Sequence, residues 1–449
     1  MVYLLHDTDI GGDSDDMAET FLIEALRDNG ECQSVAETCV CNGDSRYGQY
    51  YHTGQCMEVA KNWYGNFYVP IGILRNSALW LWDVYASAIA SEYASTLLRY
   101  ADENDIPNAL LVQRQALVDA ADGSVHMVTT GPLRNLRHLY ESPADDISPL
   151  TGAELMRLKL NELVIALGVY LHPDDYIFPE GDDTANLPAD PWGAEVINQL
   201  ATDEEIKVVW VDLGYEVYTD VNGIAMNPLK RAFQLWTGYL WHSWGAMAIL
   251  YAVRGLSFGG TEYFHYSAKG KRTYTAPAHV LFTFDSGNQY WLYRSQGKSF
   301  FTDIITPLCC RAPTHLGTDI PYLSAINPSQ AYPDTNIDPT ILTGKRFTGA
   351  TVVSMGEGIT VGSFSVDSDE QITIHPTIDK GAVMGFRDVL VTIPTGDGVR
   401  PGMFELLPVD LLSANLMAYD GYRCFMEQYI KRKVAGLPPF KLPNGTTWE

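Results

Sequence analysis

A short acidic segment near the N-terminus holds the residues best suited to chemistry. It reads HDTDIGGDSDDMAE from His6 to Glu19, and five carboxylates fall within ten positions, namely Asp7, Asp9, Asp13, Asp15 and Asp16. Two carboxylate charges about 5 Å apart repel by about 3 kcal/mol at an effective dielectric of about 20. A compact loop with several of them therefore favours a bound cation, and oxygen ligands suit Ca²⁺ or Mg²⁺. The alternative is a solvated acidic turn that holds no ion.

Three known loop motifs fit this segment less well. An EF-hand loop needs a Glu at its twelfth position, where this sequence has Ala18. A dinucleotide-binding loop needs GxGxxG, and only the pair Gly11–Gly12 is present. A phosphatase motif of the form DxDx[TV] needs Thr or Val where Gly11 stands.

The elements that would position the carboxylates are a strand before them and a helix after them. Val2–Leu5 is a short apolar run, and Asp16–Asn29 has apolar residues at helical spacing. Apolar and β-branched runs predict further strands at Val35–Cys41, Val69–Ile73, Val125–Thr129 and Val208–Leu213. Helical patterns lie between them at Ala78–Tyr100, Asn108–Ala121 and Ala153–Leu167.

This alternation predicts an α/β fold, with a Rossmann-like, mostly parallel sheet and helices on both faces, over residues 1–314. In such folds ligands bind at the carboxyl edge of the sheet, where the acidic segment would lie.

Residues 315–449 have a different texture and predict a small β-rich domain. Short alternating strands are expected at Val352–Val353, Ile359–Val366, Gln371–His375 and Val389–Ile393, between Gly and Asp turns. A helical pattern from Val409 to about Ala435 and a tail would close this domain.

Composition argues against two classes of partner. The chain has 449 residues, with 55 acidic and 30 basic side chains and a formal net charge of −25. This acidity disfavours nucleic-acid polymers and anionic membrane surfaces. The stretch between Arg231 and Arg254 has no charge and is long enough to span a bilayer. It contains polar residues such as Gln234, so we expect a buried helix and no membrane association.

The sequence also predicts an intracellular protein, either cytoplasmic or part of a particle assembled inside the cell. No basic stretch followed by an apolar run and a cleavage site opens the chain. Seven cysteines form no CxxC pair, which favours reduced thiols.

Five sequence blocks together resemble the inosine-uridine-preferring nucleoside hydrolase family. They are DTDIGGDSDD, CVCNGD, SVHMVTTGPLRNLRHL, ANLPADPWGAEVI and HSWGAMAILYAVRG, and they cover about residues 1–312. The first resembles the family's DxDxG…DD calcium motif, with two extra residues before the last pair. The resemblance implies a nucleoside hydrolase fold and calcium-assisted hydrolysis of the N-glycosidic bond of ribonucleosides to base and ribose.

The resemblance assigns metal and catalytic roles. Asp9 would be general base and calcium ligand, and Asp16 and the carbonyl of Thr130 would be further calcium ligands. His242 is the candidate general acid for the leaving base, and a structural histidine among aromatic neighbours is the alternative.

The resemblance also assigns the partners of the sugar hydroxyls. These are Asp15, Asn42 and Asn186. The two inserted residues leave open whether Asp13 or Asp15 takes the sugar role.

One position departs from the family's pattern. Gly245 stands where the family's helix carries an Asp that completes the calcium shell. Ligand charge count moves calcium affinity over a range of about 10⁻⁹ to 10⁻³ M, so a lost carboxylate weakens the site and Gly245→Asp is expected to strengthen it. The alternative function is a catalytically inactive protein of this fold that serves as a structural or binding component of an assembly, for example a virion. The C-terminal domain would then mediate contacts in a homo-oligomer or a larger assembly.

Overall fold

The computed structural model describes residues 1–40, 52–75, 79, 83–167, 180–183, 185–284 and 287–408. The chain divides into two compact units, Met1–Thr314 and His315–Glu449. Apolar cores lie within each unit, so each is described by itself.

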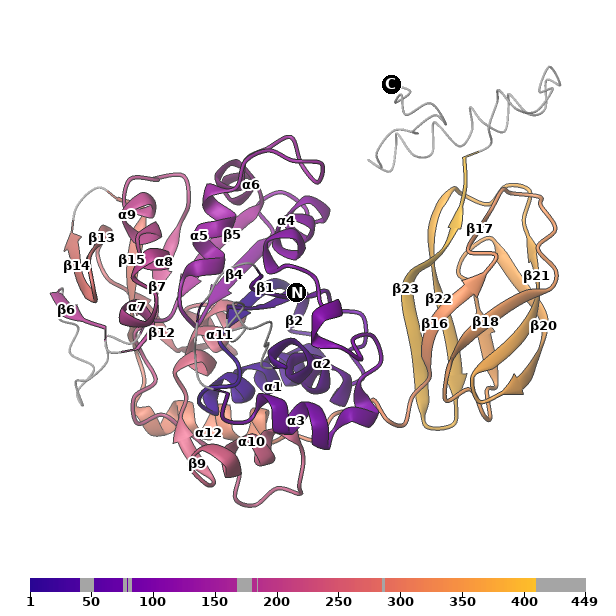
Figure 1. The fold of residues 1–449 in the computed structure, drawn as a ribbon, viewed down its shortest axis with the longest axis horizontal. Coiled ribbons are helices and arrows are strands. Elements are labelled where there is room, and N and C mark those ends of the chain that lie inside the picture. The colour runs from indigo at the N-terminus through magenta and orange to yellow at the C-terminus, as the bar shows by residue number, and fades with distance from the viewer. Residues whose placement is uncertain are drawn as a thin grey trace. The chain divides into compact units, whose positions relative to one another are not determined.

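The first unit alternates strands with helices (Figure 1). Its main strands are β1 (Val2–Thr8), β2 (Cys32–Cys39), β3 (Ile71–Ile73), β4 (Val125–Thr129), β5 (Leu160–Ile165), β6 (Glu180–Asp182), β7 (Val208–Trp210), β12 (Phe264–Tyr266), β13 (Gly270–Thr275), β14 (His279–Phe284) and β15 (Gln289–Arg294). Short strands outside this set are β8 (Tyr218–Asp220), β9 (Leu240–His242), β10 (Ser257–Phe258) and β11 (Thr261–Glu262). The helices are α1 (Asp15–Asp28), α2 (Thr53–Trp63), α3 (Ala86–Glu92), α4 (Ala109–Asp119), α5 (Arg134–Glu141), α6 (Gly152–Lys159), α7 (Asn186–Ala189), α8 (Pro191–Ala194), α9 (Val196–Leu200), α10 (Pro228–Trp236), α11 (Trp244–Arg254) and α12 (Lys298–Cys309).

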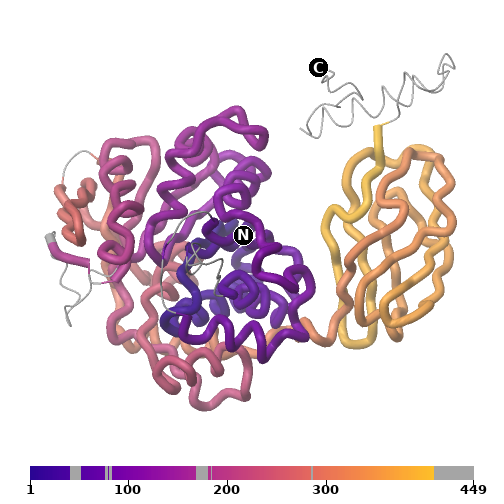
Figure 2. Tube along the Cα trace, viewed as in Figure 1, coloured from indigo at the N-terminus to yellow at the C-terminus, as the bar shows by residue number. Residues whose placement is uncertain are grey.

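The main strands form one 11-stranded sheet in the order β3-β2-β1-β4-β5-β7-β15-β13-β14-β6, with β12 paired to β15. Every pairing from β3 through to β15 is parallel. The strands β13, β14, β6 and β12 extend the sheet in antiparallel fashion. The N-terminal strand β1 therefore lies inside the sheet, between β2 and β4. Figure 2 follows the same chain as a tube from the N-terminus in indigo.

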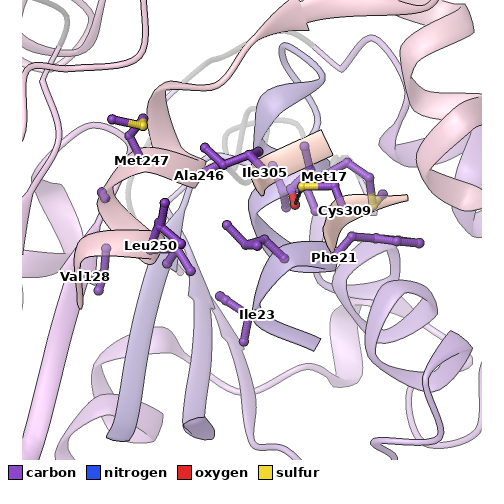
Figure 3. Close-up of a cluster of buried hydrophobic side chains, with 14 of the residues drawn as sticks. Met17, Phe21, Ile23, Val128, Ala246, Met247, Leu250, Ile305 and Cys309 are labelled. Carbon is purple, nitrogen blue, oxygen red and sulfur yellow. Dashed lines mark hydrogen bonds between the residues drawn. The ribbon is translucent and has the colours of Figure 1, made fainter. Parts of the chain in front are cut away.

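Two apolar cores cover the two faces of this sheet. Because successive side chains on a strand point to opposite faces, Leu4 enters one core and Leu5 the other. The Leu4 core contains side chains from α1, α2, α11 and α12, and the Leu5 core contains side chains from α4, α5, α6 and α9. Figure 3 shows part of the first core, where Met17 and Phe21 of α1 lie near Cys309 of α12, and Leu250 of α11 lies near Val128 of β4.

The fold class predicted from the sequence is confirmed, because the sheet is mostly parallel and has helices on both faces. The strand predicted at Val125–Thr129 is β4.

Two helix predictions are wrong in part. Ala153–Leu167 holds α6 and then β5, because Leu163 and Ile165 face one core while Val164 faces the other, which is a strand alternation. Of the predicted helix Ala78–Tyr100, the described α-helical part is α3 alone, and it is followed by a short 3₁₀ turn.

The uncharged segment predicted as one buried helix is also different. It forms the end of α10, then β9, then α11, because β9 pairs with β8 in an antiparallel ladder. No helix among the described residues is long and apolar enough to cross a membrane.

The second unit contains two four-stranded sheets (Figure 1). One has the order β16-β18-β21-β20 and the other β17-β23-β22-β19. The strands are β16 (Tyr322–Asn327), β17 (Gln330–Ala331), β18 (Thr340–Lys345), β19 (Val352–Ser354), β20 (Ile359–Ser368), β21 (Gln371–Ile378), β22 (Gly385–Ile393) and β23 (Gly396–Leu406). Apolar side chains of both sheets share one core, as in a β-sandwich. The β-rich character predicted for this region is confirmed, and the helix predicted from Val409 lies outside the described residues.

Candidate active site

The acidic segment lies at a break in the strand order of the parallel sheet. β1 is flanked by β2 on one side and β4 on the other, so the connections after β1 and β4 leave the sheet in opposite directions. This is the switch point at which open α/β sheets bind ligands, at the carboxyl ends of the strands. Asp9 follows the end of β1, and Thr130 follows the end of β4.

The loop between β1 and α1 is held in place by a tight turn. Gly11 has a φ of +124°, which favours glycine, and a Cβ there would lie 3.1 Å from the Cβ of Ala86. The carbonyl of Gly11 accepts a hydrogen bond from the backbone N–H of Val84 at 2.8 Å. The chain before α3 thus fixes the loop that carries Asp9 and Asp13.

The structure brings several of the predicted site carboxylates together. Asp13, Asp15 and Asp16 each offer an oxygen, and these oxygens all lie within 4.8 Å of one another. Asp15 and Asp16 are buried in the first turn of α1, whereas Asp13 is half-buried. Thr8 Oγ1 donates a hydrogen bond to Asp16 Oδ1 at 3.3 Å. These three residues, which we call the carboxylate cluster, form a group that can hold a metal ion.

Asp9 lies close to the cluster from the β1 side. A Cβ placed on Gly131 would lie 2.7 Å from Oδ1 of Asp9, so the Asp9 side chain packs directly against the loop after β4. Electrostatic repulsion couples Asp9 to Asp13 and Asp16.

Burial is the largest cause of the high pKa of these side chains. It raises the pKa of Asp9, Asp15 and Asp16 well above the usual range, and repulsion from neighbouring carboxylates raises it further. Burial also raises the pKa of Asp13. A buried group of carboxylates that repel one another fits a divalent cation, which would neutralise them.

Asp7, the first acid of the segment, does not join the cluster. Its Oδ1 accepts hydrogen bonds from Thr38 Oγ1 at 2.6 Å and from Asn135 Nδ2 at 2.8 Å. As the neighbour of His6 and Thr8 on β1, it points to the opposite face of the sheet. Burial raises the pKa of Asp7 to about 7. Asp7 therefore ties β1 to β2 and α5.

A further acidic residue of α1, Glu19, joins the site and was missed by the sequence analysis. It is fully buried, and its Oε1 accepts a hydrogen bond from Thr130 Oγ1 at 2.8 Å and pairs with His6 Nε2 at 3.1 Å. Its charge acts on Asp9 and on all three cluster residues. The available signal was helical spacing, since Glu19 follows Asp15 and Asp16 by four and three residues.

A buried chain of charges extends from Glu19 away from the cluster. His6 Nδ1 lies 2.7 Å from Glu37 Oε2, and Lys61 Nζ lies 2.5 Å from Glu37 Oε1 and 3.0 Å from Glu24 Oε1. Burial alone would lower the pKa of His6, but Glu19 and Glu37 outweigh it and raise this pKa to about 10. His6 is therefore a cation at neutral pH and holds the Glu19 carboxylate in place.

His242 lies on β9 among aromatic rings. It stacks on Tyr215 and Tyr218, with ring centroids 4.9 and 5.1 Å away, and Trp241 and Trp244 adjoin it. Its Nδ1 accepts a hydrogen bond from the backbone N–H of Glu216 at 2.9 Å. Burial lowers the pKa of His242, so the ring is neutral with its proton on Nε2. The charge of Asp13 also acts on the pKa of this ring, in the raising direction.

The remaining predicted site residues lie in different places. Thr130 adjoins β1, since its backbone N–H donates to the carbonyl of Asp7 at 2.9 Å. Asn186 begins α7 and is half-buried, and the hydrogen bonds of the described residues do not connect its side chain to the carboxylate cluster. Asn42 lies outside the described residues.

Gly245 lies at the start of α11, directly beside the cluster. Its backbone N–H donates to Asp15 Oδ2 at 3.3 Å. A Cβ on Gly245 would collide with Oε2 of Glu19, so the volume for a side chain at this position is already occupied.

Comparison with known proteins gives likenesses among solved structures. No family model matches the chain, and no curated protein matches it. It is similar to an inosine-uridine preferring nucleoside hydrolase from Bacillus anthracis, with 14% identity and a TM-score of 0.45 over 69% of this chain and 99% of the other. It is similar to a plant nucleoside hydrolase, with 16% identity and a TM-score of 0.48 over the same shares. It is also similar to an inosine-guanosine nucleoside hydrolase, with 16% identity and a TM-score of 0.44 over 69% and 99%.

Proposed function

We propose that the first unit is a nucleoside hydrolase-like enzyme that cleaves the N-glycosidic bond of a ribonucleoside with the help of Ca²⁺. The observation that carries the proposal is the group formed by Asp9 and the carboxylate cluster at the switch point between β1 and β4. The resemblance of the sequence blocks assigns calcium and ribose binding to this same segment.

The residues present suit a calcium ion. Asp9, Asp16 and the carbonyl of Thr130 would hold it, and Asp15 or Asp13 would accept hydrogen bonds from ribose hydroxyls. A bound Ca²⁺ lowers the pKa of a water and orients hydroxyl groups. Asp9 is the general base in this proposal: its carboxylate takes the proton of the water whose oxygen bonds to the anomeric carbon. As that bond forms, the bond to the base breaks, and the leaving base takes the electron pair.

The aromatic group around His242 is the proposed place for the base. Tyr215, Trp241 and Trp244, which adjoin His242, are half-buried aromatic residues. The neutral His242 donates a hydrogen bond from Nε2 to the leaving base in this proposal and thereby stabilises its developing charge. Protonated His242 would be a general acid only below its lowered pKa.

Base release from nucleosides tests the function. We expect the purified chain to release base from inosine or uridine in millimolar Ca²⁺, as measured by chromatography. Asp9→Asn should reduce the rate at least 10²-fold, since general-base catalysis contributes about 10²–10⁴-fold. Asp122→Asn is the matched control, because Asp122 is 66% exposed and pairs with Lys159 away from the cluster. Absence of base release from every ribonucleoside would contradict the proposal.

A second candidate is a non-catalytic binding protein, and two observations favour it. Gly245 offers no side-chain ligand at a position where the resemblance implies one, and the second unit contributes no described residue to the carboxylate cluster. The second unit would then serve contacts in a homo-oligomer or larger assembly. Calorimetric binding of a ribonucleoside without any base release would support this candidate.

A further inference from the structure

Glu19 lies where a residue at position 245 would otherwise place its side chain. A Cβ on Gly245 would collide with Oε2 of Glu19 and would lie 2.7 Å from its carboxyl carbon. The two positions therefore compete for one volume. The bare backbone of Gly245 admits the Glu19 carboxylate, and a side chain at 245 would have to displace that carboxylate.

The two oxygens of Glu19 have different surroundings. Oε1 is engaged by Thr130 Oγ1 at 2.8 Å and by His6 Nε2 at 3.1 Å. Oε2 is buried and has no hydrogen-bond partner among the described residues. A buried acceptor without a partner costs about 1–3 kcal/mol, and more when it is charged. A cation bound at Oε2 would remove this cost.

The unpartnered oxygen is carried by the same helix as two residues of the carboxylate cluster. Glu19 follows Asp15 and Asp16 by one turn of α1, so the three side chains share a helix face. Asp15 Oδ2 accepts from the backbone N–H of Gly245 at 3.3 Å, and Glu19 Oε2 abuts the same glycine. Both carboxylates thus meet at the start of α11.

We propose that Glu19 is the carboxylate ligand that this chain uses in place of a residue at position 245, with Oε2 completing the oxygen shell of the divalent cation of the proposed function. This inference rests on the metal site of the proposed function and extends it. The ligand charge that the resemblance assigns to α11 comes instead from α1, so the charge count of the site is retained. The sequence-based expectation for Gly245→Asp is then reversed, because a new carboxylate would collide with Glu19.

Calcium titration by calorimetry on five variants of the full chain, Glu19→Ala among them, tests the proposal. Glu19→Gln keeps the shape and removes the charge, and should bind Ca²⁺ at least tenfold more weakly than the wild type. Gly245→Asp alone should also weaken binding. The double variant Glu19→Ala with Gly245→Asp should recover affinity to within about threefold of the wild type, since one carboxylate again fills the volume. Glu24→Gln is the matched control, because Glu24 is buried on the same helix but pairs with Lys61, and it should bind Ca²⁺ as the wild type does.

Equal calcium affinity of Glu19→Gln and the wild type would overturn the proposal, and so would a double variant as weak as Glu19→Ala alone. Circular dichroism on each variant verifies that it is folded, and the recovery in the double variant separates ligand loss from a folding defect. A wild type that binds no Ca²⁺ also overturns the proposal.

Base release, measured on the same samples, separates this inference from the hydrolase function. If the wild type binds Ca²⁺ through Glu19 but releases no base, the role of Glu19 as a calcium ligand is supported and the proposed hydrolase function is contradicted. If the wild type releases base and Glu19→Gln binds Ca²⁺ as tightly as the wild type, only the role of Glu19 as a calcium ligand is contradicted.

Discussion

At the scale of single residues, the position of the Asp9 carboxylate depends on a neighbour that has no side chain. A Cβ on Gly131 would lie 2.7 Å from Oδ1 of Asp9 and 2.9 Å from its Cβ, which is too close for unbonded atoms. Asp9 has a short side chain and must move if Gly131 becomes Ala. Because a misplacement of about 1 Å can cost about 10²-fold in rate, we expect Gly131→Ala to reduce kcat/KM for base release by 10- to 100-fold.

Gly223→Ala is the control for Gly131→Ala, because a Cβ at Gly223 meets nothing within 4 Å. It should keep the wild-type rate, and both variants should keep a melting temperature close to that of the wild type. A Gly131→Ala variant with full activity would show that the place of Asp9 beside the β4 loop does not matter for catalysis.

The buried charges behind the site give a prediction for stability and its pH dependence. Glu37 accepts from Lys61 and pairs with His6, and these two cations outweigh burial and lower the pKa of Glu37 from 4.5 to about 2. Removing one partner of a buried pair costs about 3–5 kcal/mol, so we expect Glu37→Gln to lower the free energy of unfolding by that amount at neutral pH. The measurement is urea unfolding.

The sign of the pH effect follows from the lowered pKa. The contribution of Glu37 is fully present above about pH 4.5 and is lost as pH falls toward about 2. The difference between wild type and Glu37→Gln should therefore shrink over that window. Glu92→Gln is the control, since Glu92 is 43% exposed and pairs with Arg231 at the surface, where a pair contributes about 0–1 kcal/mol. A difference that stays constant down to pH 2 would contradict the assignment.

Residue types alone predicted that acidic side chains form a site near the N-terminus. They did not predict which of these side chains take part in it. Spacing did not separate Asp7, which points to the opposite face of the sheet, from Asp9. It also did not reveal Glu19, because its role depends on the empty volume at Gly245, on another helix 226 positions further along the chain. Such contacts between distant segments carry no local sequence signal.

At the scale of elements, the loop after β7 packs against the start of α11 and so helps to place Gly245 and His242. Gly214 in this loop has a φ of +118°, and a Cβ there would lie 2.6 Å from the Cα of Trp244. Gly214→Ala would therefore push the loop away from α11. We expect a loss of stability of more than about 1 kcal/mol and weaker calcium binding, as measured by thermal unfolding and calorimetry.

Gly238→Ala separates the two causes of that effect. Gly238 also has a left-handed backbone, with a φ of +110°, but a Cβ there meets nothing within 4 Å. It should lose stability through backbone strain and keep its calcium affinity. Equal calcium affinities for the two variants would mean that the β7 loop does not position the start of α11.

Elements with one strong periodicity were predicted well, and those that depend on tertiary pairing were not. β4 and α1 follow from apolar runs and helical spacing. The segment after α6 reads LNELVI, whose apolar residues fit a short helix as well as a strand, and only its pairing with β4 and β7 makes it β5. The same holds for β9, which exists because β8 pairs with it.

At the scale of the whole molecule, the two units have separate cores, and this predicts separate responses to core substitutions. Phe404 is fully buried in the core of the second unit, and Phe21 is fully buried in the core beneath the carboxylate cluster. A Phe→Ala change in a core costs about 3–5 kcal/mol. We expect Phe404→Ala to lower the unfolding transition of the second unit while calcium affinity and base release stay at wild-type levels.

Phe21→Ala is the matched substitution in the first unit, and it should reduce both calcium affinity and base release, because Phe21 lies on the helix that carries Asp15, Asp16 and Glu19. Scanning calorimetry follows the transitions, and sedimentation velocity follows the oligomeric state of each variant. If the second unit mediates assembly, Phe404→Ala should shift the chain toward smaller species while the site remains functional. Loss of calcium binding in Phe404→Ala would instead show that the candidate site depends on the second unit, although none of its described carboxylates comes from there.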